Sequence, residues 1–132
     1  MKAMDRPNQP KGTSGGKLCR NHLFIYHGDG EHIRVAIDDI AFLRANRNYC
    51  EIHIRDKRTF IVSVPMLEVI EKIPSPNFVR FNRSYIVNLD FVVKIIGNQV
   101  ELMDGTLLII GRTYREAIQS NLIFIGSRKR NK

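Results

Sequence analysis

Short runs of apolar residues, often alternating with polar ones, follow one another along most of the chain and are separated by turn-forming residues. A period of two residues is typical of β-strands that bury one face. The runs expected to be strands are His22–His27, His32–Ile37, Asp39–Ala45, Tyr49–Arg55, Thr59–Val64, Tyr85–Val87, Phe91–Ile96, Gln99–Met103 and Thr106–Ile110. Between the first two runs, Gly28-Asp29-Gly30 predicts a hairpin turn.

Signals for helix are few. Ser63 could cap a short helix over Pro65–Ile73, whose apolar residues share one broad face, and Pro74 would end it. A second helical stretch is expected over Tyr114–Asn121, followed by the apolar run Leu122–Ile125. Many short strands with one or two short helices predict a mainly β domain, built as a sandwich or a barrel.

Charge is concentrated at the two ends of the chain. The 132 residues carry a formal net charge of +8, but residues 23–127 hold twelve basic and twelve acidic residues. Residues 1–20 contain two prolines, three glycines and few apolar residues, so we expect a flexible basic arm there. One domain is expected over 21–125, followed by a basic tail at 126–132. Binding of an anionic partner by the body therefore requires local clustering of arginines.

The sequence offers no pattern for a metal, a cofactor or a catalytic centre. Cys19 and Cys50 form no metal-binding spacing and are expected to be free thiols. The four histidines match no metal-ligand template, and three of them lie on the first expected hairpin, facing solvent. No run is apolar and long enough for a signal peptide or a membrane span, which predicts a cytoplasmic protein.

Three polar segments, each carrying one arginine, border apolar runs. These segments are Asn46-Arg47-Asn48, Asn82-Arg83-Ser84 and Gly111-Arg112-Thr113. A polar segment between two apolar blocks is expected at a strand end or loop tip, where its side chains point outward. Arginine and asparagine present planar, multi-donor groups that suit phosphates and the edges of guanine and adenine. Residue types alone would equally fit solvated surface loops.

Three blocks of the sequence resemble the LytTR-type DNA-binding domains. Phe78–Leu89 reads FVRFNRSYIVNL and is similar to the family motif Phe-x-Arg-x-His-Arg-Ser-Tyr-hydrophobic-Val-Asn. Ile40–Tyr49 resembles an upstream block of the family, and Gly111–Tyr114 resembles a downstream one. The blocks span about Leu23 to Leu122. Asn82 replaces the usual His of the motif, and Arg44 stands where the family often has Glu.

The resemblance implies an elongated mainly β fold of about ten strands, similar to a β-sandwich, and sequence-specific binding of duplex DNA through loops that enter successive major grooves. By position it implies that the DNA-binding residues are Arg47, Asn48, Tyr49, Asn82, Arg83, Ser84 and Arg112. It further implies a transcriptional regulator of bacteria, comparable to the output domain of a response regulator, acting at promoter direct repeats. The 20 residues before the domain are too few for a receiver domain, so we expect control through expression level, a separate partner protein or a homodimer on DNA.

Several residues near the motifs have structural alternatives. Tyr49 and especially Tyr85 fit core aromatics. Asn48 fits a turn residue, and Asn88 fits a hydrogen bond to the following turn. Asn82 could read adenine, or it could brace its loop, which the alternation with Arg83 favours. Arg80, like Arg44, fits a solvated edge-strand arginine as well as a phosphate contact.

Two other classes of function remain open on sequence grounds. One is an interaction module without enzymatic activity that binds protein, or nucleic acid without sequence preference. The other is a nuclease in which Glu51 and His53, two residues apart on one strand face, act as acid and base. Neither has a motif to support it, and we expect no enzymatic activity.

Overall fold

The computed structural model describes residues 21–126 and shows ten β-strands in three antiparallel sheets. The strands are β1 (His22–Gly28), β2 (Glu31–Ala36), β3 (Ile40–Asn46), β4 (Tyr49–Ile54), β5 (Thr59–Val62), β6 (Phe78–Asn82), β7 (Tyr85–Asn88), β8 (Val92–Ile96), β9 (Gln99–Leu102) and β10 (Leu107–Ile109). The short helices α1 (Met66–Glu71) and α2 (Arg115–Ser120) complete the fold, together with 3-10 turns at Ile37–Asp39, Leu89–Phe91 and Arg112–Tyr114. The mainly β prediction is confirmed. The expected arm at 1–20 and most of the expected tail lie outside the described residues.

Strand periodicity located most elements to within two residues, but the expected helix cap is wrong. Helix α1 has Pro65 at its N-cap position, and no side chain caps it. Ser63 lies two residues before that position, in the bend that follows β5. The Pro65 carbonyl accepts the first helical hydrogen bonds, from the N–H groups of Glu68 at 3.0 Å and Val69 at 3.2 Å, so the helix begins at Pro65 without a hydroxyl cap. The run Leu122–Ile125 follows α2 without joining a strand.

The central sheet has five strands in the order β5-β4-β3-β7-β6, and its two faces contact different cores. Leu43 and Ile86 belong to a first core shared with the β1–β2 hairpin and α1. Their neighbours Phe42 and Val87 belong to a second core shared with the three-stranded sheet β10-β9-β8 and α2. Because successive side chains of a strand point to opposite faces, one sheet can serve both cores.

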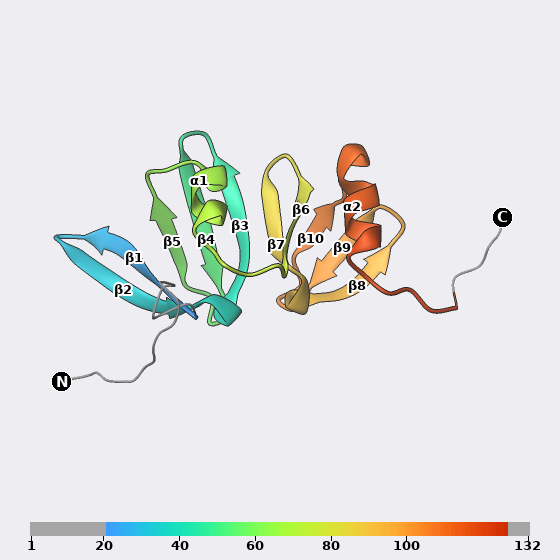
Figure 1. The fold of residues 1–132 in the computed structure, drawn as a ribbon, viewed down its shortest axis with the longest axis horizontal. Helices are drawn as coiled ribbons and strands as arrows, with labels where there is room; N and C mark the ends of the chain where they lie inside the picture. Colours follow the sequence, from blue (N-terminus) through green and yellow to red (C-terminus); the bar gives the residue numbers. More distant parts are fainter. Residues whose placement is uncertain (1–20, 127–132) are drawn as a thin grey trace, which may run out of the picture.

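The molecule is elongated, with the β1–β2 hairpin, the five-stranded sheet and the three-stranded sheet arranged along its longest axis (Figure 1). The β3–β4 turn, the β6–β7 turn and the start of α2 all lie at one long edge, the upper edge in Figure 1. None of the described helices is long and apolar enough to cross a membrane. The fold thus brings three connections that are distant in sequence to the same side.

Candidate nucleic-acid interface

The first of these connections is the tight turn between β3 and β4. Asn46 pairs with Tyr49 across the hairpin, which leaves Arg47 and Asn48 as the two turn residues. Arg47 has a φ of 61°, a left-handed conformation that glycine adopts readily and arginine does not. Arg47, Asn48 and Tyr49 are all exposed. An arginine is therefore held at a turn position where glycine would be the ordinary choice.

The second connection is the β6–β7 turn, which is braced by its own side chains. The Asn82 amide donates through Nδ2 to the Ile109 carbonyl at 2.7 Å and accepts through Oδ1 from the Ser84 backbone N–H at 2.8 Å. Arg80 donates to the carbonyl oxygens of Asn82 at 3.1 Å and Arg83 at 2.6 Å. Asn82 thus makes the bracing contacts that the alternation favoured. Arg80, expected to be solvated or phosphate-bound, instead holds the turn.

The third connection runs from β10 through Gly111 into the 3-10 turn Arg112–Tyr114. Gly111 packs closely on the second connection, since a Cβ built on it would lie 2.9 Å from Tyr114 Cδ2 and 3.4 Å from Asn82 Cβ. The Arg80 guanidinium lies over the Tyr114 ring, 5.5 Å from its centroid. Arg112 is exposed, as is Arg115 at the start of α2. Arg115 was not singled out from the sequence, because it lies outside the motif.

Backbone hydrogen bonds join the three connections to one another. The Ala45 N–H at the end of β3 donates to the Ser84 carbonyl at 2.7 Å, and the Gly111 N–H donates to the Phe81 carbonyl at 2.8 Å. Together with the bond from Asn82 to Ile109, they connect segments more than 25 residues apart in sequence. The three arginine-bearing turns are therefore held in a fixed relation to one another.

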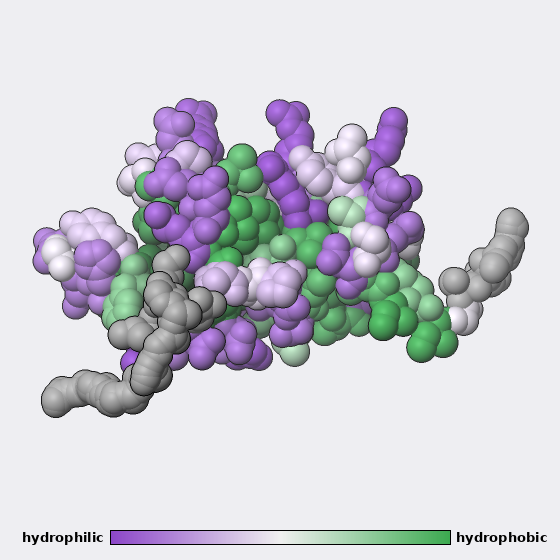
Figure 2. All heavy atoms as spheres, in the orientation of Figure 1, coloured by the Kyte–Doolittle hydropathy of each residue, from purple (hydrophilic) through white to green (hydrophobic). Residues whose placement is uncertain are grey.

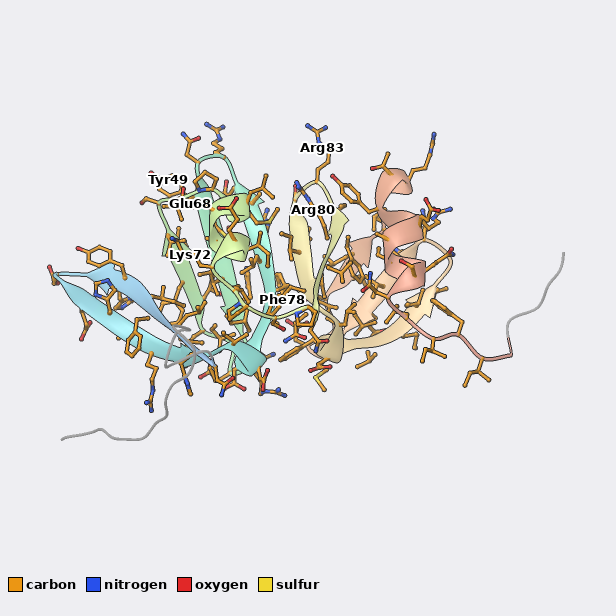
Figure 3. The ribbon with its side chains drawn as sticks, viewed as in Figure 1. Tyr49, Glu68, Lys72, Phe78, Arg80 and Arg83 are labelled. Carbon is orange, nitrogen blue, oxygen red and sulfur yellow. The ribbon has the colours of Figure 1, made fainter. Side chains whose placement is uncertain are left out.

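Hydrophilic groups project from this edge at three places, over the β3–β4 turn, the β6–β7 turn and the start of α2 (Figure 2). Figure 3 shows Arg83 extending from its turn away from the sheet, while Arg80 lies lower, against the strands. Among residues 21–126, the guanidinium groups of Arg47, Arg83 and Arg112 form no ion pair or hydrogen bond. We name this set of arginines and its supporting turns the arginine edge. Its cations are free to contact an external anion.

The pair Glu51 and His53, considered as acid and base, belongs to a partly buried polar network. Glu51 accepts hydrogen bonds from Arg44 at 3.1 Å, Asn46 at 3.2 Å and His53 at 2.9 Å. The His53 ring stacks on Phe42 with 4.2 Å between centroids. Burial by itself would raise the pKa of Glu51, but the hydrogen bonds from His53, Arg44 and Asn46 outweigh it and lower the pKa. A carboxylate held ionised by three donors stabilises the sheet and is a poor proton acceptor.

The remaining residues near the motifs have structural roles. Asn88 is buried, accepts from the Asp90 N–H at 3.0 Å and donates to the Ile40 carbonyl at 2.9 Å, as the turn-bonding interpretation predicted. Tyr85 is half-buried against the second core. Cys50 is a buried free thiol, and burial raises its pKa to about 11. No cluster of metal-ligating side chains occurs within 21–126.

The fold and the arginine edge together define a β-rich domain with exposed arginines fixed along one side, where an anionic partner could bind. The sequence model of the LytTr DNA-binding domain matches residues 30–123, and the chain belongs to this family. Among solved structures it is similar to the LytTr DNA-binding domain of a Bacillus cereus protein described as a methyl-accepting/DNA response regulator, with a TM-score of 0.68 and 18% identity over 83% of this chain and 100% of that one. A comparison with curated proteins finds no match.

Proposed function

We propose that the protein is a sequence-specific transcriptional regulator that reads duplex DNA with its arginine edge. The observation that carries this proposal is that three turns, each with an unpaired arginine, are tied together at one side of a domain whose family binds DNA. Arg83 and Arg112 suit the O6 and N7 atoms of guanine, and each such contact discriminates by roughly 1–3 kcal/mol. Arg47, Asn48, Tyr49 and Ser84 would complete the contact with phosphates or bases.

The charge distribution supports specific over general attraction. Residues 23–127 carry equal numbers of basic and acidic residues, and several of the acidic ones pair with arginines away from the edge, such as Asp39 with Arg55 and Asp56 with Arg58. A domain body without net charge attracts the phosphate backbone weakly, so its affinity for DNA has to come from contacts made by specifically positioned side chains. An elongated edge with three contact points can follow a duplex across successive major grooves.

The test is to select bound sequences from random duplex DNA and then measure affinity for the selected and a scrambled site at one salt concentration. The wild type should prefer the selected site. Arg83→Ala and Arg112→Ala should each lose about 10-fold or more of that preference. Arg34→Ala is the matched control, because Arg34 is an exposed arginine on β2, away from the edge. It removes the same charge and should leave the preference unchanged.

Equal affinity of the wild type for both sites would reject the regulator and favour a module that binds nucleic acid without sequence preference. If Arg34→Ala lowered the preference as much as Arg83→Ala, the arginine edge would be the wrong surface. Promoter direct repeats as target sites, a homodimer on DNA and a separate regulatory partner protein belong to the same proposal. The spacing of repeats in the selected sequences addresses the first two.

A further inference from the structure

A groove of about 810 Å³ is lined mainly by residues of β1, β5 and α1. These elements lie toward the opposite end of the molecule from the described C-terminus (Figure 1). Apolar side chains form most of its wall. They are Leu23, Ile25, Ile52, Val62, Val64 and Val69. Phe24, Tyr26 and Ile61 add further apolar surface, and all three are exposed to solvent. Ile61 is 63% exposed. A cavity of this size and composition is in the range of sites that take an apolar ligand.

Both strands that border the groove have an unpaired side. Within the described part of the chain, β5 pairs only with β4 and β1 pairs only with β2. The strands approach each other without forming a ladder. Exposed strand edges beside an apolar surface are places where a further polypeptide segment can add. The groove therefore suits an extended apolar peptide.

The chain carries such a peptide at its other end. Leu122 packs on the second core, but Ile123 and Ile125 beyond it are each 92% exposed and Phe124 is 51% exposed. Hydrophobic surface is visible in Figure 2 at the end of the molecule where the described chain stops. Three consecutive apolar residues that no other part of 21–126 covers are a candidate interaction site. We name Ile123–Ile125 the apolar segment.

We propose that the apolar segment of one copy docks in the groove of a second copy, so that the protein associates head to tail. The segment cannot reach the groove of its own chain, because the two lie at opposite ends of the long axis (Figure 1). The 20 residues before Asn21 are a poorer occupant, since they are mostly polar and contain two prolines and three glycines. The segment is the part of this chain whose chemistry matches the groove.

Charge beside the groove is nearly balanced. Lys72, at the C-terminal end of α1, is one of the residues that line the groove, and Glu68 and Glu71 lie exposed on the same helix (Glu68 and Lys72 are labelled in Figure 3). The pairing therefore rests on the apolar character of the groove and the segment and on their positions at opposite ends of the molecule.

A head-to-tail contact joins two different surfaces and is not a two-fold contact, so each copy in the assembly can contact two neighbours. The association itself does not depend on the proposed DNA binding, and it can be measured without DNA. Its failure and the failure of the proposed function are therefore distinguishable.

The experiment is sedimentation velocity of the full chain over a range of concentrations. The wild type should rise from 15.3 kDa to at least twice that mass as concentration increases. Ile123→Ser with Ile125→Ser should stay at the monomer mass, and so should Ile61→Asp, which places a charge in the groove. The matched control is Ile96→Ser with Leu107→Ser, which removes two other exposed apolar side chains (57% and 58%) and should associate like the wild type.

Mixing the variants decides the geometry. The variant Ile123→Ser with Ile125→Ser keeps its groove, and Ile61→Asp keeps its apolar segment, so an equimolar mixture of these two should form a dimer that neither forms alone. A mixture that stays monomeric overturns the head-to-tail contact. The contact is also overturned if the variant Ile123→Ser with Ile125→Ser associates as strongly as the wild type. The proposal is also overturned if the wild type stays monomeric at every concentration. If that monomer binds an apolar dye and Ile61→Asp does not, the groove binds an apolar molecule other than a second copy of this chain.

Discussion

Among single residues, Arg47 combines an unfavourable backbone conformation with a free guanidinium group. Its φ of 61° lies in the left-handed region, which costs a residue with a Cβ about 1–2 kcal/mol. Such strain persists where the surrounding structure enforces it, often at functional sites. Arginine at this position is consistent with a role in binding that offsets the strain.

We expect Arg47→Gly and Arg47→Ala to separate the two properties. Both remove the guanidinium group and should weaken DNA binding to a similar extent. Alanine keeps the strain, whereas glycine relieves it, so the glycine variant should be the more stable of the two by about 1 kcal/mol. Thermal melts and DNA titrations of both variants measure this. Equal melting temperatures, or unimpaired binding by both, would contradict the interpretation.

Asn82 illustrates how an amide in a recognition motif can be occupied internally. Both of its polar atoms are used, one by the Ile109 carbonyl and one by the Ser84 N–H. We expect Asn82→His to lower the free energy of unfolding by roughly 1–2 kcal/mol and to leave the selected DNA sequence unchanged. Site selection and thermal melts of both proteins measure this. A changed base beside the Arg83 contact, without loss of stability, would show that Asn82 reads DNA directly.

Between elements, the close packing of the second and third connections depends on Gly111. An added Cβ would lie 2.9 Å from Tyr114 Cδ2, so Gly111→Ala has to displace the ring that Arg80 covers or move the turn itself. We expect a loss of about 1–3 kcal/mol in stability, as is common when a packed site is overfilled. Specific DNA affinity should fall with it, because Arg112 moves relative to Arg83.

The measurement for Gly111→Ala is a melt together with affinity for the selected and the scrambled site. Affinity for the scrambled site should change little, because the number of cations is the same. A variant that melts like the wild type and keeps its preference would show that the two connections do not need this close packing.

Across the whole molecule, the terminal charges and the arginine edge should act differently. Removal of residues 1–20 is expected to leave the fold and the DNA preference intact, because that segment has few apolar residues to contribute to a core. A fall of several degrees in melting temperature, the size expected when native interactions weaken by roughly 1 kcal/mol, would place the start of the domain before Asn21.

Removal of Arg128–Lys132 should weaken binding to selected and scrambled DNA by the same factor. A basic tail that binds phosphates releases counterions and carries no sequence information. The salt slope should therefore fall by roughly 0.9 for each phosphate that the shortened chain no longer neutralises. Affinity titrations at several salt concentrations measure both effects. A change in the preferred sequence would assign base reading to the tail.

The strands, the polar turns and the three motif blocks could be predicted from the amino-acid sequence, because each depends on neighbouring residues. Alternating apolar residues predicted the hairpins, and turn residues marked where the chain reverses. The charge-neutral body was also a property of sequence alone. These signals depend on residues that are close in sequence, so they can be recognised without knowledge of the tertiary contacts.

Tertiary packing determined how the turns are joined and what each polar side chain contacts. Arg80 and Asn82 bond to backbone carbonyls, which every residue has, so no sequence pattern marks the partner. The Ser63 cap failed for a related reason, since Pro65 starts α1 without a side-chain partner. The groove beside β5 likewise arises because β1 and β5, more than 30 residues apart, pack against one core. These features depend on which distant segments pack side by side, and that arrangement exists only in the folded structure.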